Sequence, residues 1–531
     1  MPIPEIQKNG DSDLYVAEIE DILSTKTKGA SPCRGFRHDI SEALEFAPAE
    51  DYLVQLEHIY FDKVHLSIPM MHQDRYFRSI SLEDDARPPL YLRYAICALT
   101  ASMYPKIVPV SHEIFYQAAR KCLEDAEIRD QCLNSITLAQ AQTWVIVGTY
   151  ELTRMHFHRS YMSIGRAIRI SQMMGLHLPD DVRSSRVEIF PPASLDWVGR
   201  EEQRRTFWVI FCMDRFASVG HDWPMIIDEH DICITLPVSE HAFQTSSGAS
   251  SITLTEALIH HGSVSLSSFS ATVVMADICS RKLREARRFG LDTISGVSSD
   301  FWGRNRHLET TLNVDFCVPN HLIVSSWNWD IRLVFINIIV PSSTICVHQA
   351  AEIHAEKYGV AKELLLESKK RRVEAAEKII TILKAVSQSD LLLIHPLVAW
   401  CVYVAAAVYA KALESQPCQA QEKSLEFLLV TLFRLKAVNP LPETFLEDLT
   451  VEFCNIKDKI FALQSDSQLT NISASSTQGH LPSYDLEREL VSRTQSDDIT
   501  APYFYDFGTN LELLDVLEND VSVRENEPLG F

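Results

Sequence analysis

The chain has 531 residues, of which 46% are hydrophobic, and it carries a formal net charge of -22 at pH 7. An acidic chain repels nucleic acid unless its basic residues are concentrated in one region. This composition therefore disfavours a protein whose whole surface binds DNA or RNA. Glycine is scarce, at 17 residues, which disfavours folds that need many tight turns or phosphate-binding loops.

Residues 1–50 form a polar segment with five lysines and arginines against ten acidic residues. We expect this segment to be a disordered linker. From Tyr52 on, apolar residues recur at spacings of three and four, which indicates a helix that ends at Ile68-Pro69. The same periodicity, with prolines and capping residues, predicts further helices over 90–103, 115–130, 135–152, 160–174, 201–218, 254–289, 301–312, 361–386, 424–438 and 445–463.

Several single residues mark where these elements begin or end. Thr137 is placed to cap the N-terminus of one helix, and Gly175 suits a left-handed turn at the C-terminus of another. The serine-rich segment 239–254 is expected to be a loop. A long apolar run over 327–346 is interrupted by Pro341.

Residues 391–410 contain no Asp, Glu, Lys or Arg and are long enough to span a bilayer. The alternative is a helix that starts near Pro396 and is buried inside a helical domain. No comparable second span or basic flank stands out in the sequence. We expect the buried helix. The whole pattern predicts an all-α fold, a large irregular helical array over 51–465 with disordered N- and C-terminal segments.

Ordered short motifs run through the first half of this array and resemble one known family. They are Tyr60-Phe61, Ile68-Pro69-Met70-Met71-His72, Tyr76-Phe77, Gly165-Arg166-Ala167-Ile168-Arg169-Ile170, Met174-Gly175-Leu176-His177, Arg204-Arg205, Phe207-Trp208, Asp214-Arg215 and the stretch Asp231 to Pro237. Their order is similar to that of the fungal-specific transcription factor domain, the middle homology region of fungal binuclear zinc-cluster regulators. The resemblance is best over 52–240 and looser over 250–460.

The resemblance implies a helical regulatory domain, and one position departs from it. Asp222-Trp223-Pro224 stands where the family usually has Gly-Arg-Pro. The charged motif residues Arg204, Arg205, Asp214 and Arg215 flank an apolar segment, Phe207 to Met213, that is expected to be enclosed. Arginine and aspartate pair through two parallel hydrogen bonds, so we interpret these charges, with Phe207 and Trp208, as a structural motif. Contact with a ligand is the alternative.

The zinc cluster that such regulators carry is not expected in this chain. The twelve cysteines are scattered, no CxxC occurs, and only Cys33 precedes the helical region. The sequence therefore predicts no metal site and no cofactor. Direct DNA binding by this chain alone is not expected, because residues 1–50 have the wrong sign of charge for a DNA-binding arm.

Two surface features have more than one interpretation. The run Lys369-Lys370-Arg371-Arg372 could be a nuclear-import signal, or the solvated face of a helix. The segment 466–531 is expected to be a disordered acidic tail. Its last part, from Tyr484, holds twelve acids and three arginines around bulky apolar groups. Such a composition suits either an activation segment or an ordinary terminus.

No catalytic template is found: GxSxG, GxGxxG, GxxxxGK[ST] and HExxH are all missing from the sequence. The missing templates predict a protein that is not an enzyme. The family resemblance implies a nuclear transcriptional regulator of fungal type that controls a metabolic or secondary-metabolite gene cluster. It would act through transcriptional co-regulators or a DNA-binding partner, or as a truncated relative, with a possible small-molecule effector, possible homo- or heterodimers and no membrane association. The alternatives are a helical scaffold protein and an all-helical enzyme for a small metabolite.

Overall fold

The computed structural model describes residues 50–463 with interruptions. The gaps are 83–86, 105–110, 130–135, 180–181, 183–195, 221–222, 261–264, 295–329, 359–361, 387–390, 392, 416–417, 437–439 and 454–455. Three predictions lie outside the described residues: the linker before Glu50, the helix over 301–312, and the acidic tail over 466–531.

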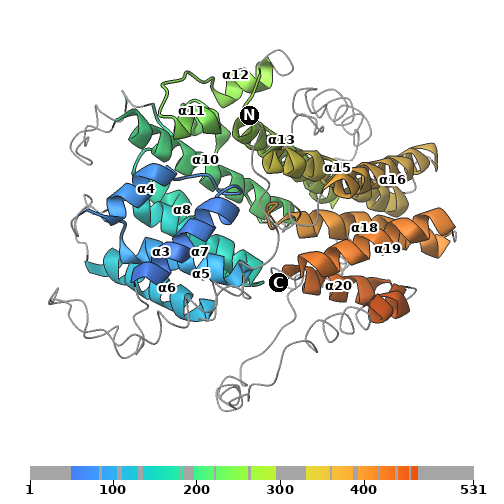
Figure 1. Ribbon diagram of the computed structural model, residues 1–531. Coiled ribbons are helices and arrows are strands. Elements are labelled where there is room, and N and C mark those ends of the chain that lie inside the picture. The colour runs from blue at the N-terminus through green and yellow to red at the C-terminus, as the bar shows by residue number, and fades with distance from the viewer. Residues whose placement is uncertain are drawn as a thin grey trace, which may run out of the picture. The chain divides into compact units, whose positions relative to one another are not determined.

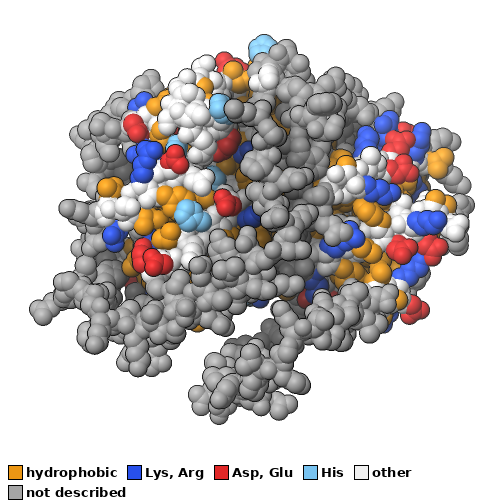
Figure 2. Space-filling model, in the orientation of Figure 1, with side chains coloured by type: hydrophobic (Ala, Val, Ile, Leu, Met, Phe, Trp, Pro, Cys, Tyr) orange, Lys and Arg blue, Asp and Glu red, His pale blue; other side chains and the backbone are white. Residues whose placement is uncertain are grey.

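The described residues confirm the predicted all-α fold. Their only extended pairing is an isolated antiparallel bridge between Thr235 and Thr253. The chain divides into two compact units, the first formed by residues up to Phe211 together with 226–256, and the second by 212–225 together with the residues from Ala257 on (Figure 1). On the face shown in Figure 2, basic and acidic side chains of the described residues are interspersed.

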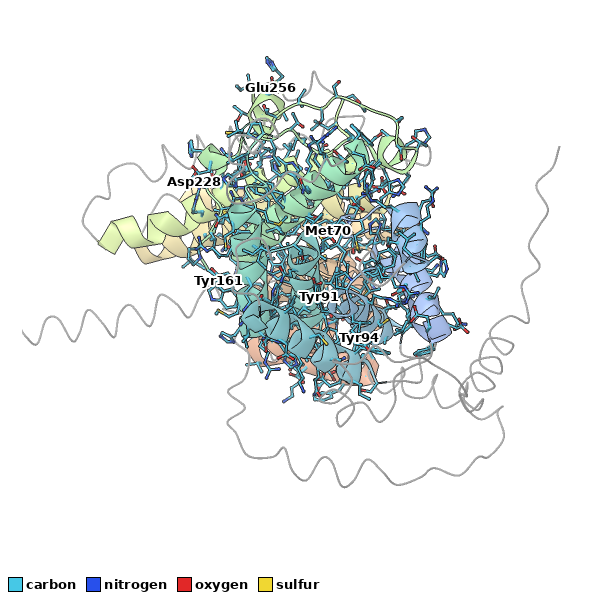
Figure 3. The ribbon with its side chains drawn as sticks, turned by 90° about the vertical axis from the view of Figure 1, so that its left-hand side faces the viewer. Met70, Tyr91, Tyr94, Tyr161, Asp228 and Glu256 are labelled. Carbon is cyan, nitrogen blue, oxygen red and sulfur yellow. The ribbon has the colours of Figure 1, made fainter. Side chains whose placement is uncertain are left out.

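The helices of unit 1 follow one another over the first half of the chain. They are α3 (Glu50–Ile59), a π-helical turn η1 (Tyr60–Val64), α4 (Gln73–Ile80), α5 (Leu90–Met103), α6 (His112–Arg129), α7 (Leu138–Thr153), α8 (Phe157–Met173), the first part of α10 (Trp197–Gly220), a short 3-10 helix η4 (Glu229–Asp231) and α11 (Glu240–Gln244). Tyr91 and Tyr94 extend from α5 and Tyr161 from α8 (Figure 3).

Helix α7 lies at the centre of unit 1 and packs against α5, α6 and α8. Its Trp144 and Tyr150 are almost completely buried. The contact with α8 needs Gly148, because a Cβ there would lie 2.7 Å from the Cδ1 atom of Ile164. Ser160 on α8 donates to the Gly148 carbonyl at 2.7 Å. The two backbones therefore approach closely, and their polar groups are satisfied at the contact.

Unit 2 is also helical. It contains the end of α10, α13 (Ser268–Ile294), α15 (Ile331–Tyr358), α16 (Lys362–Ala385), α18 (Val398–Ser415), α19 (Gln419–Leu435) and α20 (Leu441–Glu452), and α12 (Leu254–Ile259) lies at the boundary of the two units. Helix α15 packs against α13, α16 and α18 and forms the centre of this unit.

The predicted caps and ends of three helices are confirmed. Thr137 accepts from the backbone N–H of Gln140, whose side chain accepts from the Thr137 N–H, so the two form a capping box. Gly175 follows α8 with a φ of 65°, the left-handed conformation that favours glycine. Helix α5 has the predicted bounds, residues 90–103.

Two helices predicted as continuous are each divided. Instead of one helix over 254–289, the structure has α12 and α13, and the hydroxyl of Ser267 accepts from the Ser270 N–H at 3.2 Å to cap the second helix. The helix predicted over 445–463 begins earlier, in α20, and the chain leaves it at Phe453 before a second helical segment within 456–463. Apolar periodicity continues across both breaks, so it does not reveal them.

Two other local predictions were wrong. The supposed loop over 239–254 contains helix α11, which Ser239 caps by accepting from the Ala242 N–H at 3.2 Å. Pro341 does not interrupt its helix, because α15 continues through it. The hydroxyls of the following serines donate to carbonyls one turn earlier, and the packing of α15 on three helices outweighs the missing backbone bond.

The apolar run over 391–410 forms the buried helix that the sequence predicts. Helix α18 starts two residues after Pro396, and its Val402, Ala405 and Tyr409 are buried. One described stretch, Ile331–Ile353, is long and apolar enough to cross a membrane, and 78% of its most apolar window is buried inside the protein. Burial of that extent is typical of the core helix of a globular domain.

Candidate functional site

Helix α10 carries the charged motif and begins with a dense set of polar contacts. The Asp196 carboxylate accepts from the Gly199 N–H at 2.8 Å and from the Arg75 guanidinium at 2.7 Å. These contacts lower the pKa of Asp196, mainly through Arg75. The segment from Phe207 to Met213 is buried on all sides, as the sequence predicts. Asp196 thus caps the N-terminus of α10, and the apolar run places the middle of the helix in the protein interior.

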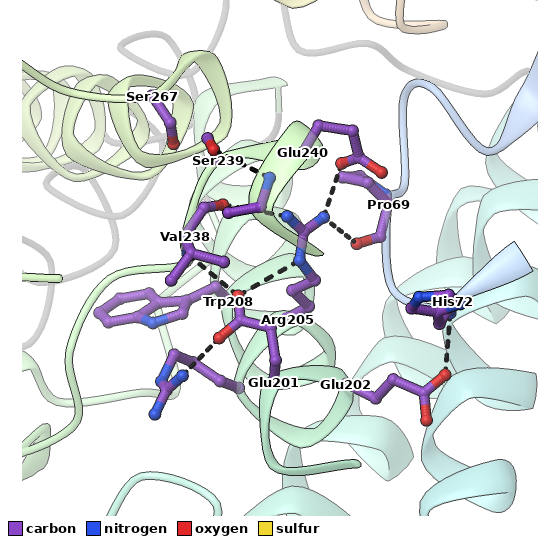
Figure 4. A network of polar contacts seen from close by, with 12 residues as sticks. Pro69, His72, Glu201, Glu202, Arg205, Trp208, Val238, Ser239, Glu240 and Ser267 are labelled. Carbon is purple, nitrogen blue, oxygen red and sulfur yellow. Dashed lines mark hydrogen bonds and ion pairs between the residues drawn. The ribbon is translucent and has the colours of Figure 1, made fainter. Parts of the chain in front are cut away.

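Arg205 is completely buried, and its guanidinium contacts segments that are far apart in the sequence (Figure 4). It donates to the Glu240 carboxylate at 2.7 Å, to the Val238 carbonyl at 3.0 Å and to the Pro69 carbonyl at 3.3 Å. Its Nε atom lies 3.3 Å from the Glu201 carboxylate. The ring of Phe243 lies against the guanidinium, 4.1 Å from ring centre to carbon. We call this set of contacts the Arg205 node.

Glu201 completes the node from inside the same helix. Its buried carboxylate also accepts from the Val238 N–H at 2.9 Å and from the guanidinium of Arg204. A buried charge is tolerated only when opposite charges and hydrogen bonds replace the water around it. Glu201 and Arg205 each supply the opposite charge that the other needs. Together they hold the segments at Pro69 and Val238 against α10.

A second set of contacts joins α10 to the start of α4. The His72 N–H donates to Glu202 at 2.8 Å, and the His72 ring lies edge-on to Phe243 at 5.0 Å. Burial raises the pKa of Glu202 and lowers that of His72. Trp208 donates its indole N–H to the Thr235 carbonyl at 2.8 Å. Several motifs of the sequence therefore meet along one face of α10.

Asp214 and Arg215 lie in unit 2, with Arg215 completely buried. Arg215 contacts Asp214 at 2.9 Å and lies 3.6 Å from Asp277 on α13. Asp277 also pairs with Arg281, one turn further along α13, at 2.5 Å. We call these four residues the Asp277 cluster. The six motif residues are thus not one site, because Arg204, Arg205, Phe207 and Trp208 belong to unit 1.

An open pocket with a volume of about 130 Å³ lies beside the Arg205 node, within unit 1. It is lined by Leu176, Pro179, Arg200, Arg204, Cys233, Ile234 and Thr235. The backbone holds its walls together, since the Cys233 N–H donates to the His177 carbonyl at 2.9 Å. Of the six charged and aromatic motif residues on α10, Arg204 is the one that lines this pocket.

The basic run on α16 is only partly available to solvent. Lys369 and Lys370 are exposed. Arg371 pairs with Glu367 at 2.9 Å, and the Arg372 side chain is only 6% exposed and pairs with Glu352 at 2.7 Å. As a folded helix, this run therefore offers two lysines to a partner and uses Arg372 to join α16 to α15.

Two buried networks in unit 1 went unrecognised in the sequence. Glu57 contacts Arg93 at 2.6 Å and the Tyr76 hydroxyl at 2.9 Å. Glu151 accepts from Tyr116 and Ser163, each at 2.6 Å, and from Arg120 at 2.7 Å. Burial raises the pKa of Glu57 although Arg93 opposes that effect. A lone acid inside an apolar helix, such as Glu151 in α7, is the signal that could have identified these networks.

The described residues contain no group of three or more His, Cys, Asp and Glu side chains placed to hold a metal ion. Six of the eight described cysteines are buried, and burial raises the pKa of four of them: Cys97, Cys212, Cys279 and Cys401. Cys233 and Cys418 are exposed. Buried thiols of raised pKa act as small apolar groups rather than as nucleophiles.

Comparison with known proteins gives a consistent result. Residues 58–307 match the model of the fungal specific transcription factor domain. A pigment biosynthesis transcriptional activator of Monascus ruber is 29% identical over 421 residues, which is 78% of this chain and 73% of the relative. A citrinin biosynthesis transcriptional activator of Monascus purpureus is 28% identical over 351 residues, 65% of this chain and 59% of the relative.

A third relative is an azaphilone cluster-specific transcription factor of Aspergillus niger, 27% identical over 331 residues, or 62% of this chain and 70% of the relative. No solved structure matches the chain. The chain thus spans between 59% and 73% of the length of these three relatives, two of which are transcriptional activators of biosynthesis and one a cluster-specific transcription factor.

Proposed function

We propose that the chain is a transcriptional regulator of a secondary-metabolite gene cluster in a fungus, because residues 58–307 match the model of the fungal specific transcription factor domain. The domain match carries this proposal. The relatives support the finer part of it, since they regulate pigment, citrinin and azaphilone biosynthesis. The azaphilone regulator is specific to one gene cluster.

In this proposal the helical body receives signals and contacts other proteins, and another polypeptide or segment contacts DNA. The charge supports this division of tasks, since the chain has a net charge of -22 and the described surface in Figure 2 mixes both signs. DNA-binding surfaces gather positive charge on one face. The partners are co-regulators or a DNA-binding protein, with homo- or heterodimers as one arrangement.

The motif residues of α10 have a structural role in this proposal, and the chain performs no catalysis. Arg205 pairs with Glu201 and Glu240 inside unit 1, and Arg215 lies 3.6 Å from Asp277 inside unit 2. Charged side chains that are paired inside the protein are not available to bind a substrate. The node and the cluster would keep the helical body in the one conformation that its partners bind.

The test is made in the fungus that carries the gene. Deletion of the gene should abolish or strongly lower the transcripts of one contiguous biosynthetic gene cluster, and chromatin immunoprecipitation of a tagged chain should recover the promoters of that cluster. Reintroducing the wild-type gene should restore the transcripts. Unchanged transcripts, together with no promoter enrichment, would contradict the proposal and leave the scaffold or enzyme alternative.

Localisation provides a second test. We propose that the chain is nuclear and that Lys369 and Lys370, the exposed half of the basic run, contribute to import. A fluorescent fusion should accumulate in the nucleus, and the double variant Lys369→Gln, Lys370→Gln should shift toward the cytoplasm. Lys378→Gln changes another exposed lysine of α16 and should have no effect. Nuclear exclusion of the wild-type fusion would contradict the regulator, whereas a nuclear double variant would contradict only the import role.

A further inference from the structure

The open pocket beside the Arg205 node has the size and the lining of a ligand site. Its volume, about 130 Å³, compares with the ~150 Å³ of an engineered protein cavity that binds benzene. Leu176, Pro179 and Ile234 supply apolar wall, and Arg200 and Arg204 supply positive charge. We infer that this pocket binds a small organic acid that carries one ring or a short apolar chain.

The arginines select the carboxylate end of such a ligand. The described lining contains two arginines and no acidic side chain. Arginine offers five N–H donors in a planar fork that matches a carboxylate. Arg200 is exposed at the start of α10 and Arg204 follows it by one turn, so both guanidinium groups reach the same side of the helix.

Arg204 is held in place before any ligand arrives. Its Nη1 atom donates to Glu201, the buried carboxylate of the Arg205 node, and its side chain is only 21% exposed. One carboxylate occupies only part of a five-donor group, so donors remain for a second anion. A fixed arginine loses little conformational entropy on binding, which favours affinity.

The surrounding acids set a limit on the strength of binding. Glu201 neutralises part of the charge of Arg204, and Asp196, near Arg200, pairs mainly with Arg75. The pocket is therefore weakly positive, and a one-ring acid should bind with a Kd of about 0.1–1 mM. A neutral ligand of the same shape should bind at least about tenfold more weakly, since it loses the charge-assisted hydrogen bonds.

Cys233 provides a reporter for the pocket. It is exposed and lines the pocket, whereas Cys418, the other exposed cysteine among the described residues, immediately precedes α19 in unit 2. The purified full chain is treated with iodoacetamide, and peptide mass spectrometry gives the alkylation rate at each of the two thiols. Benzoate is the probe, and benzamide is its neutral counterpart.

We expect benzoate to slow alkylation of Cys233 at least about threefold at millimolar concentration while Cys418 reacts as before. Benzamide should give little protection at the same concentration. The variant Arg200→Gln, at an exposed position, should need about tenfold more benzoate for the same protection. Arg169→Gln, which changes an exposed arginine of α8, should behave like the wild type.

Three results would overturn the inference. Equal protection by benzoate and benzamide would show that the pocket recognises only the apolar ring. Equal protection of Cys418 would show that the effect of benzoate is not specific to the pocket. Unchanged alkylation of Cys233 up to about 10 mM benzoate would exclude the site for acids of this size. The experiment uses purified protein and no promoter, so its outcome is independent of whether the chain regulates transcription.

Discussion

The two units bury arginines of the same motif in different ways. In unit 1, Arg205 contacts two carboxylates and two backbone carbonyls, and its partners are spread from Pro69 to Glu240. In unit 2, the contacts of Arg215 with Asp214 and Asp277 connect α10 to α13, and Arg281 shares Asp277. Arg205 thus fixes the segments around Pro69 and Val238, which lie outside the long helices, to α10, whereas the contacts of Arg215 run between two long helices.

This difference indicates how each unit should respond to loss of its arginine. Loss of Arg205 takes a partner from two carboxylates and a donor from two backbone carbonyls, whereas after loss of Arg215 the Asp277 carboxylate keeps Arg281. Carbonyls that lose a donor add to the cost. The four predictions below test the comparison in order of expected size.

The largest effect is expected for Arg205→Met. The substitution removes one partner each from Glu201 and Glu240 and the donor to two carbonyls, so the free energy of unfolding of unit 1 should fall by about 3–5 kcal/mol. Urea unfolding followed by tryptophan fluorescence measures it, because Trp208 lies in the next turn. Arg169→Met, at an exposed position, is the control and should change stability by less than about 0.5 kcal/mol.

If Arg205→Met does not fold, Arg205→Lys makes the same test, because lysine keeps the charge and loses the planar fork. It should still destabilise unit 1 by at least about 1 kcal/mol. A loss below that size for both variants would show that the node does not hold the segments at Pro69 and Val238.

Arg215→Met should cost less, about 2 kcal/mol, because it takes one partner from each of Asp214 and Asp277, and Arg281 remains beside Asp277 at 2.5 Å. The double variant Arg215→Met, Arg281→Met should lose more than the sum of the single variants, since Asp277 then has neither arginine. Urea unfolding of the three variants measures the difference. Additive losses would mean that the arginines do not share Asp277 in the way the distances indicate.

Unit 2 should also lose stability in mild acid because of two buried histidines. Burial lowers the pKa of His395 to about 4. The pKa of His348 is also lowered to about 4, mainly by burial and further by the positive charges of Arg371 and Arg372. The unfolded chain takes up these protons near pH 6.5 and the folded chain only near pH 4. Their contribution is therefore complete above pH 6.5 and is lost as the pH falls toward 4, by roughly 1.5 kcal/mol per histidine at pH 5.5.

Replacing one histidine isolates this contribution. His395 stacks on Phe335 at 4.8 Å, so His395→Phe keeps the ring contact and removes the proton. The variant should lose less stability than the wild type between pH 7 and pH 5.5. His241→Gln, at an exposed position of unit 1, is the control and should follow the wild-type curve. Parallel curves for His395→Phe and the wild type would refute the assignment.

The smallest effect is expected at the capping box of α7. Thr137→Ala removes the acceptor for the Gln140 N–H and should lower the stability of unit 1 by about 1 kcal/mol. Thermal unfolding can measure a change of this size. Thr381→Ala, at an exposed threonine inside α16, removes no cap and should lie within about 0.5 kcal/mol of the wild type.

Much of the fold could be predicted because its signals are local. Helix α5 follows two prolines and is largely apolar, and Thr137 and Gly175 mark helix ends through their own hydrogen bonding and backbone conformation. Local signals fail where tertiary contacts outweigh them. Pro341 remains inside α15 because three helices pack around it, and α11 forms within a serine-rich segment.

The candidate site could be predicted only in part. The sequence indicated that Arg205 and Arg215 would need acidic partners, since the segment between them is apolar. It could not indicate which acids these are, because Glu240 lies 35 residues from Arg205 and Asp277 lies further still from Arg215. The pocket was not foreseen for the same reason, as it is formed from three segments that only the fold brings together.

A double-mutant cycle between Arg205 and Glu240 tests most directly the claim that the motif residues hold the helical body together. The free energy of unfolding is measured for the wild type, Arg205→Met, Glu240→Gln and the double variant. A coupling energy of at least about 1 kcal/mol is expected, because the two side chains meet at 2.7 Å with one of them fully buried. Single losses that simply add would contradict the account and would free Arg205 for a role in binding.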